Sequence, residues 1–191
     1  MTDVNKDQTS ALTSVIDAFE QGQLLVYPTE AVMGIGCDPD NEIAVNALLT
    51  LKQRPVEKGV ILVAANYSQF LPYVNDNGIA QHRRTEIMSS WPGPNTWLLP
   101  KSQSAPIWIT GKHDKIAVRV SNHPVVKALC NALGKPIVST SANLAGEPPT
   151  KTLAEAKRVF GDSVVYIDGE VGDNDKPSTI LDGDTGEIIR A

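Results

Sequence analysis

The pair of cations at Lys52 and Arg54 is the clearest candidate for chemistry in this sequence. One residue separates the two, and Pro55 follows, which favours an extended backbone for the residue before it. Side chains two residues apart on an extended segment project on the same side. Arg grips phosphate oxygens with a fork of N–H groups and Lys adds a compact charge, so the pair suits a polyphosphate. A solvated helix end, where cations are favoured, is the competing interpretation.

A second candidate is the polar stretch Ser139-Thr-Ser-Ala-Asn143, which follows a short apolar run. Ser139, Ser141 and Asn143 alternate, so in an extended segment their side chains share one face. Their hydroxyl and amide groups can hydrogen-bond to phosphate or carboxylate without adding charge. A turn or a helix N-cap would use the same residue types. The stretch therefore predicts either an anion site or a local cap.

Three more polar residues end an apolar run or lie within one. Thr29 and Glu30 come after Tyr27 and a proline that stops the strand, and α/β sheets bind ligands at such strand ends. The alternative for Thr29 is a turn in which its hydroxyl bonds to nearby backbone. Arg119 lies inside the apolar run 116–120. It therefore needs a buried anionic partner, as in an internal salt bridge, or a bound anion.

No nucleophile with a partner base accompanies these groups. Ser139 and Ser141 lie in no GxSxG elbow, and no GxxxxGK[ST] loop occurs. Gly34-Ile-Gly36 lacks the third glycine of a dinucleotide fingerprint and is expected to be a tight turn after a strand. The histidines and cysteines have no ligand spacing, so no metal held by protein side chains is expected. Cations and hydroxyls alone favour phosphoryl or nucleotidyl chemistry over acyl-enzyme formation.

Helical and extended patterns alternate along the chain, which favours an α/β sheet with flanking helices. Short turns join several of the strands, so the sheet is expected to be mixed. Gly134 is placed to end one helix, and Thr152 with Glu155 forms a capping-box pattern at the start of another. Helices are expected over 12–19, 44–51, 79–91, 125–133 and 152–160, and strands over 23–27, 60–65, 97–99, 116–120, 137–140, 164–167, 178–181 and 187–190.

The chain has 191 residues and a formal net charge of −5. This length suits one domain, expected over residues 9–190 after a polar N-terminal segment, residues 1–8. The acidic balance and an aromatic content of 5% disfavour a protein that coats nucleic acid through bulk charge. No apolar run approaches the roughly 20 residues of a membrane span, and no signal-peptide pattern is present. We therefore expect a cytoplasmic protein without membrane contact.

Eight short motifs occur along the chain in this order: Tyr27-Pro-Thr-Glu30, Gly34-Ile-Gly36, Lys52-x-Arg54-Pro55, Trp91-Pro-Gly-Pro94, Ala117-Val-Arg-Val120, His123-Pro124, Ser139-Thr-Ser-Ala-Asn143 and Pro177-Ser-Thr-Ile180. Their order resembles that of the YrdC family. The resemblance extends from about Thr9 to Arg190, and the compact length is similar to that of the short bacterial TsaC form. Each motif is weak alone, but eight in register are specific.

The resemblance implies the YrdC-like fold, an open twisted mixed α/β sheet with flanking helices and a large, concave, positively charged cavity. It also implies a threonylcarbamoyl-AMP synthase, a nucleotidyltransferase that combines L-threonine, bicarbonate or CO2, and ATP with Mg2+. The products are pyrophosphate and an adenylate. Partner proteins of the TsaD, TsaB and TsaE type then transfer the threonylcarbamoyl group to the adenosine beside the tRNA anticodon. No tightly bound cofactor is implied.

The resemblance also assigns residues to the two substrates. Family motifs that hold ATP match Lys52, Arg54, Ser141 and Asn143, and Arg190 is expected to reach the nucleotide; Lys52 and Arg54 are the implied catalytic pair. The positions expected near threonine are Thr29, Arg119, Ser139 and Ser178. The chain departs from the family pattern at Ala31 and over residues 57–66.

Two other functions remain open from the sequence. A non-catalytic module could bind double-stranded RNA or tRNA by shape, with a possible tRNA contact through a positive cavity. A related domain of much larger proteins carries out a carbamoyl-adenylate step in enzyme maturation. For the synthase, a negative protein with a positive pocket is expected, in which Lys52, Arg54 and Arg119 converge on one cavity.

Overall fold

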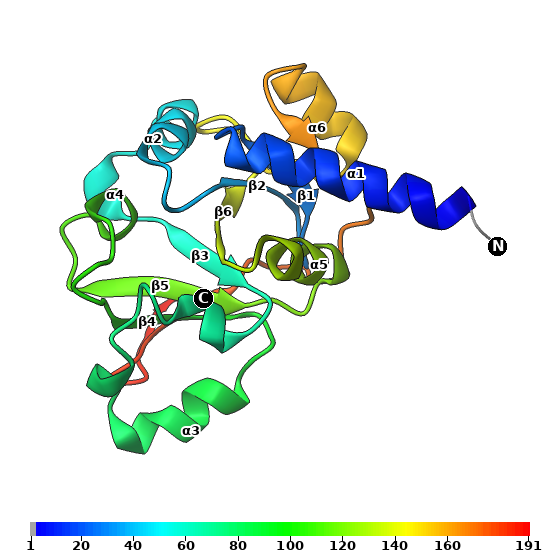
Figure 1. Ribbon diagram of the computed structural model, residues 1–191. Coiled ribbons are helices and arrows are strands. Elements are labelled where there is room, and N and C mark those ends of the chain that lie inside the picture. Colours follow the sequence, from blue (N-terminus) through cyan, green and yellow to red (C-terminus); the bar gives the residue numbers. More distant parts are fainter. Residues whose placement is uncertain (1–2) are drawn as a thin grey trace.

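A single mixed sheet organises the protein (Figure 1). The computed structural model describes residues 3–191, with the side chains of residues 12–191. Within that range the sheet has nine strands in the order β7-β1-β2-β6-β3-β5-β4-β8-β9. The open mixed α/β architecture expected from the sequence is confirmed. The strands are β1 (Leu25–Pro28), β2 (Met33–Cys37), β3 (Ile61–Ala64), β4 (Asn95–Pro100), β5 (Lys115–Val120), β6 (Ile137–Ser141), β7 (Val165–Tyr166), β8 (Thr179–Asp182) and β9 (Ile188–Arg190).

All five expected helices are present, and their ends lie within two residues of those expected, except that the first helix begins at Asp3 instead of residue 12. Gly134 ends one of them in the left-handed conformation, at a φ of 67°. Thr152 and Glu155 form the expected capping box, because each accepts a hydrogen bond from the backbone N–H of the other. None of the helices within residues 3–191 combines the length and apolar character that a membrane crossing requires. The helices are α1 (Asp3–Glu20), α2 (Glu42–Leu51), α3 (Gln81–Ser89), α4 (Ile107–Thr110), α5 (Pro124–Leu133) and α6 (Leu153–Phe160), with 3-10 turns at Val56–Lys58, Tyr67–Phe70 and Asp76–Gly78. Thus α1 begins within the polar segment 1–8 that was expected to precede the domain.

The expectation of a tight turn at Gly34-Ile-Gly36 is wrong. These residues lie within β2, all of which is buried and which pairs antiparallel with both β1 and β6. Glycine is a poor strand former, so the two glycines of this segment did not predict a strand. The glycines are needed because the neighbouring chain comes very close: a Cβ on Gly36 would lie 1.9 Å from the carbonyl oxygen of Val138.

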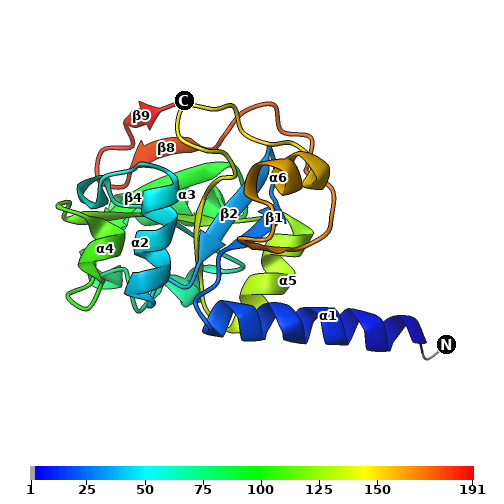
Figure 2. The same ribbon diagram turned by 90° about the horizontal axis from the view of Figure 1, so that it is seen from above.

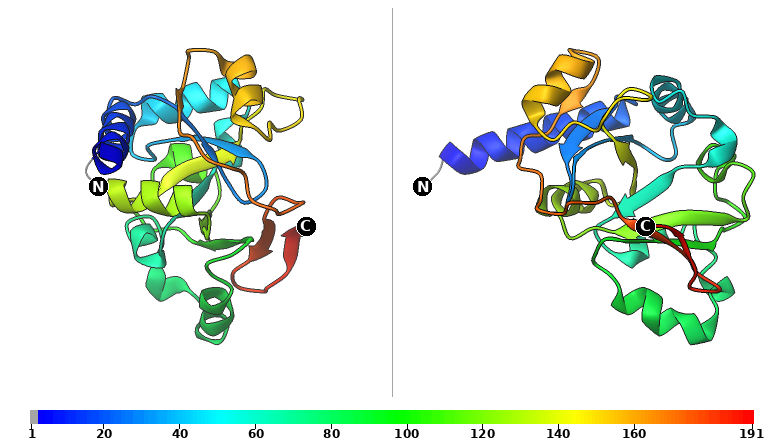
Figure 3. Two further views of the ribbon diagram at one scale, coloured as in Figure 1. Left: turned by 90° about the vertical axis from the view of Figure 1, so that its right-hand side faces the viewer. Right: turned by 180° about the vertical axis from the view of Figure 1, so that it is seen from behind.

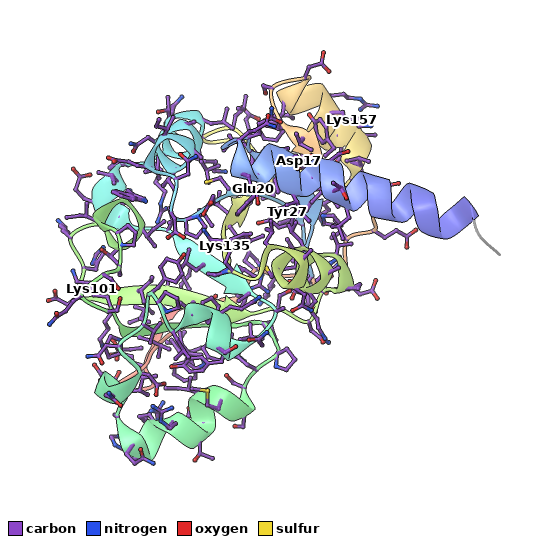
Figure 4. All side chains as sticks on the ribbon, viewed as in Figure 1. Asp17, Glu20, Tyr27, Lys101, Lys135 and Lys157 are labelled. Carbon is purple, nitrogen blue, oxygen red and sulfur yellow. The ribbon has the colours of Figure 1, made fainter. Side chains whose placement is uncertain are left out.

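The Tyr27 side chain fills the space that these glycines leave. A Cβ on Gly34 would lie 2.9 Å from the Tyr27 ring, and one on Gly36 would lie 2.8 Å from its hydroxyl. The ring therefore crosses β2, and its hydroxyl donates a 2.8 Å hydrogen bond to Ser139 Oγ on β6. Burial raises the pKa of Tyr27 far above its usual value, so this hydroxyl remains a donor. Figure 4 labels Tyr27 beneath α1.

Helices cover both faces of the sheet around β1 and β2. One face packs against α1 and α5, through Phe19 and Leu129 among others. The opposite face packs against α2 and α6, with Leu48 and Phe160 in the core. Figure 2 shows α1 and α5 together on one side of β1 and β2, with α6 on the other.

The chain ends in the β8–β9 hairpin. β8 pairs parallel with β4, and β9 pairs antiparallel with β8. Figure 3 shows this hairpin on the side of the molecule away from α1 and α5. The hairpin places Arg190 next to Ser178. The Arg190 guanidinium donates a 3.3 Å hydrogen bond to the Ser178 carbonyl oxygen.

The close approach at Gly36 yields a stability prediction. Gly36→Ala forces a methyl group into the Val138 carbonyl, so we expect the free energy of unfolding to fall by about 3 kcal/mol or more. Gly134→Ala is the matched control: its left-handed backbone is strained, but no atom lies within 4 Å of the added Cβ. That control should cost about 1 kcal/mol. Urea unfolding of both variants measures the difference, and equal losses would contradict this account of β2.

Candidate functional site

Two adjoining cavities bring together most of the polar residues singled out in the sequence. The larger has a volume of about 460 Å³ and is lined by Lys52, Arg54 and Lys58, with residues of α4, β5 and β9. The smaller has a volume of about 200 Å³. It is lined by all four residues expected near threonine, Thr29, Arg119, Ser139 and Ser178, and by Ser141, Asn174 and Lys176. Both cavities share Ile61, Ser139, Thr140 and Arg190.

Lys52 and Arg54 line the same cavity, but not through the extended backbone that their spacing suggested. Lys52 is the C-cap of α2 in a helical conformation, and Gln53 has a left-handed φ of 45°. The backbone N–H groups of Lys52 and Arg54 still bond to carbonyls of the last helical turn. The helix end therefore turns the two side chains into the cavity, so the helix-end interpretation describes the backbone correctly.

The Lys52 ammonium donates to three protein oxygens. Nζ lies 2.8 Å from the carbonyl oxygens of Ser141 and Asn143 and 2.6 Å from Asn143 Oδ1. An ammonium has three N–H donors, so all of them are engaged. Asn143 lines neither cavity but holds the loop in place, since its amide donates to the carbonyls of Leu144 and Glu147. Lys52 thus fixes the end of β6 while its charge faces the larger cavity.

Lys115, which also lines the larger cavity, pairs with Asp182 and Asp184, but three other cations of that cavity have no acidic partner among the side chains described. Among the side chains described, residues 12–191, no carboxylate forms an ion pair with Lys52, Arg54 or Arg190. Burial and then the Arg54 charge lower the pKa of Lys52 to about 8. Partial burial and the Arg190 charge likewise lower the pKa of Arg54 below its usual value. Mutual repulsion of this kind is relieved by a bound anion.

Arg119 has an internal partner. Its Nη1 lies 2.8 Å from Glu30 Oε2, and the other oxygen of that carboxylate accepts hydrogen bonds from the Ser121 hydroxyl and the Asn122 N–H. Burial alone would raise the pKa of Glu30, but the Arg119 charge and the hydrogen bonds lower it to about 2. The internal salt bridge that the sequence left open is therefore present.

Arg119 lines the smaller cavity, whereas Lys52 and Arg54 line the larger. The expectation that the three cations converge on one cavity is therefore wrong. They divide between two adjoining cavities because Arg119 lies on β5 beside β3, while the other two follow the end of α2.

The hydroxyls of the smaller cavity have local partners. Thr29 Oγ1 donates to the carbonyl of Val32 at 2.7 Å, which is the turn arrangement considered from the sequence. Ser178 Oγ lies 2.8 Å from Thr96 Oγ1. Ser139 Oγ accepts from Tyr27, which leaves its own hydrogen to donate into the cavities that it lines.

Several polar lining residues were not expected from the sequence, among them Lys58, Asn174 and Lys176. Lys58 comes from a 3-10 turn, and Asn174 and Lys176 come from the loop between β7 and β8. None of these three follows an apolar strand, which is the position at which site residues were expected. Only the position of Lys176 directly before the Pro177-Ser178 motif pointed toward the site.

The fold and the site define an open-sheet α/β protein with a cation-lined hollow that suits an anionic ligand. The family model Sua5/YciO/YrdC, described as telomere recombination, matches residues 17–191, so the chain belongs to the Sua5/YciO/YrdC family.

Relatives are similar over most of this chain. A threonylcarbamoyl-AMP synthase of Pseudoalteromonas atlantica is 59% identical over 169 residues, which cover 88% of this chain and 90% of the relative. One from Yersinia enterocolitica is 51% identical over 184 residues, 96% of this chain and 97% of the relative. Among solved structures, P. abyssi Sua5 complexed with L-threonine is 30% identical with a TM-score of 0.82. That alignment covers 90% of this chain and 50% of Sua5, so this chain spans about half of that protein.

The Glu30–Arg119 pair should contribute measurably to stability. Folding lowers the Glu30 pKa from 4.5 to about 2. The contribution of the pair to the free energy of unfolding is therefore full above pH 4.5 and is lost as the pH falls through about 2. We expect Glu30→Gln to lower the free energy of unfolding at pH 7 by roughly 2–3 kcal/mol, since it leaves Arg119 without its partner. The difference from wild type should shrink between pH 4.5 and 2.

Glu20→Gln is the matched control for this prediction, because Glu20 is exposed at the end of α1 (Figure 4). Urea unfolding across this pH range provides the measurement. A Glu30→Gln effect that does not depend on pH would contradict the ion-pair explanation.

Proposed function

We propose that this protein is a threonylcarbamoyl-AMP synthase, a nucleotidyltransferase that makes threonylcarbamoyl-adenylate and pyrophosphate from L-threonine, bicarbonate or CO2, and ATP. The observation that carries the proposal is the cluster of Lys52, Arg54 and Arg190, which have no carboxylate partner among the side chains of residues 12–191, next to a smaller hydroxyl-lined cavity. Membership of the family and relatives named for this activity support it.

The larger cavity is proposed as the ATP site. Its cations suit a triphosphate, which arrives as its Mg2+ complex, and no tightly bound cofactor is needed. Lys52, Arg54 and Arg190 face the phosphates. Ser141 and Asn143 act there by holding Lys52, because both contribute oxygens to its ammonium.

The smaller cavity is proposed as the threonine site. Its volume of about 200 Å³ suits a small amino acid. The hydroxyls of Thr29, Ser139 and Ser178 and the Arg119 guanidinium line it. L-threonine is the molecule bound to the Sua5 relative from P. abyssi, which favours the same ligand class here.

The chemistry requires no protein nucleophile. The amine of threonine adds to CO2, losing a proton, and gives a carbamate. A carbamate oxygen then attacks the α-phosphorus of ATP, and the bond to the β-phosphate breaks to release pyrophosphate. The protein orients the two substrates, an effect worth up to roughly 7–11 kcal/mol in favourable cases. Its cations stabilise the charge that develops on the phosphates.

The product belongs to a longer sequence of steps in the cytoplasm. Proteins of the TsaD, TsaB and TsaE type would receive the adenylate and transfer its threonylcarbamoyl group to tRNA. An RNA-binding module without catalysis is the alternative, and such a protein would bind tRNA with a steep salt dependence and without ATP or threonine.

Loss of a single cation should reduce turnover strongly. If each contact is worth about 3–4 kcal/mol in the transition state, Lys52→Ala or Arg54→Ala lowers turnover by a factor on the order of hundreds. Pyrophosphate release and labelled adenylate, formed from ATP, threonine and labelled bicarbonate, measure the effect.

Lys157→Ala on α6 serves as the control, since this exposed lysine lies outside both cavities (Figure 4). Near-normal turnover in both cavity variants would sink the assignment. Product formed without threonine would point to a different substrate.

The lowered pKa of Lys52 predicts how nucleotide affinity depends on pH. Below a pKa of about 8 the ammonium is charged and attracts phosphate, and above it the neutral amine predominates. The affinity for a non-hydrolysable ATP analogue should therefore fall as the pH rises through 8, by up to roughly tenfold per pH unit.

Lys52→Arg keeps its charge throughout this range and should flatten the profile, whatever its absolute affinity. Titration calorimetry from pH 7 to pH 9.5 compares the two proteins. Parallel profiles would show that another group controls the pH dependence.

A further inference from the structure

The smaller cavity has an excess of positive charge that the Arg119–Glu30 pair does not supply. Four charged side chains line it: Glu30, Arg119, Lys176 and Arg190. Glu30 and Arg119 neutralise one another across 2.8 Å. The charge that remains to attract an anion therefore comes from Lys176 and Arg190.

Lys176 lines the smaller cavity and not the larger one. Arg190 lines both cavities, and its charge acts on Arg54 in the larger one. Lys176 is exposed at the rim of the smaller cavity, and within residues 12–191 no carboxylate forms an ion pair with it.

The loop that carries Lys176 is held against the residues that build the cavity. The backbone N–H of Gly172 donates to the carbonyl of Thr29, and that of Asn174 donates to the carbonyl of Glu30, both at 2.9 Å. A Cβ on Gly172 would lie 2.8 Å from the Glu30 carbonyl oxygen, so this contact is close-packed. Beyond Lys176, Ser178 bonds to Thr96. The lysine is thus placed between two anchored positions.

We propose that Lys176 pairs with the α-carboxylate of the amino-acid substrate, and that Arg119 contributes hydrogen bonds to the same cavity without a net charge. The proposal rests on the proposed function. In that reaction the amine must stay available for CO2, so the carboxylate is the charged group of threonine that the protein can hold throughout. A lysine on an exposed rim suits this role because it can follow the ligand as it enters.

Binding of two ligands separates a carboxylate contact from a general effect on the loop. Calorimetry compares L-threonine with L-threoninamide, in which a neutral amide replaces the carboxylate. We expect Lys176→Met to weaken threonine binding roughly two- to fivefold, as for an exposed ion pair. Its affinity for threoninamide should be unchanged or higher.

Three further readouts sharpen the experiment. Lys176→Arg should retain most of the threonine affinity, since it keeps the charge. Lys151→Met, at an exposed lysine outside both cavities, should bind threonine like the wild type. In turnover, Lys176→Met should raise KM for threonine by the same factor as its affinity loss, with kcat and the affinity for the ATP analogue within twofold of wild type.

Each contrary outcome overturns a distinct claim. Wild-type threonine affinity in Lys176→Met, in a protein that makes the adenylate, overturns the role of Lys176 and leaves the proposed function standing. Equal losses for threonine and threoninamide show that the lysine only supports the loop, which also overturns that role. Failure of the wild type to bind or consume threonine overturns the proposed function itself, and the role of Lys176 with it.

Discussion

The Glu30 carboxylate is the contact on which the arrangement of the smaller cavity depends. One oxygen holds Arg119 of β5, and the other accepts from Ser121 and the backbone N–H of Asn122. The Glu30 backbone carbonyl accepts from Asn174, so the same residue also holds the loop before β8. Two segments distant in sequence, residues 119–122 and the loop that contains Asn174, are thus fixed to the end of β1. A buried carboxylate can do this only because its charge is compensated, and the compensation determines how much positive charge the cavity has left.

Local neutralisation of charge also explains how an acidic protein presents positive charge inside. Many of its cations lie next to acids: Lys115 pairs with Asp182 and Asp184, and Lys135 with Asp38. The charge of such pairs is cancelled locally and contributes little to the field in a cavity. Lys52, Arg54 and Arg190 of the larger cavity are different, because they bond to carbonyl and amide oxygens and to no carboxylate among the side chains of residues 12–191. A net charge of −5 for the whole protein is therefore compatible with a positively charged larger cavity.

The sequence predicts well what local rules determine. The capping box at Thr152 and the left-handed Gly134 are set by neighbours along the chain, so those helix ends are found where expected. Prediction from the sequence fails where contacts between distant segments determine the structure. β2 contains glycines because Val138 and Tyr27 come close, and nothing near Gly36 in the sequence shows that approach. Lys176 likewise reaches its cavity through loop contacts with β1, which no periodicity reveals.

The shared wall of the two cavities limits where a transfer between their ligands can occur. A nucleotide in the larger cavity and an amino acid in the smaller one meet only along the residues that line both. Among these residues, Ser139, Thr140 and Arg190 carry polar groups. The Ser139 hydroxyl accepts from Tyr27, and the Arg190 guanidinium donates to the Ser178 carbonyl. Under the proposed function, the carbamate oxygen and the α-phosphorus come together beside these two side chains. The close packing of Tyr27 across β2 then has a chemical purpose, since it fixes the Ser139 oxygen at the meeting point.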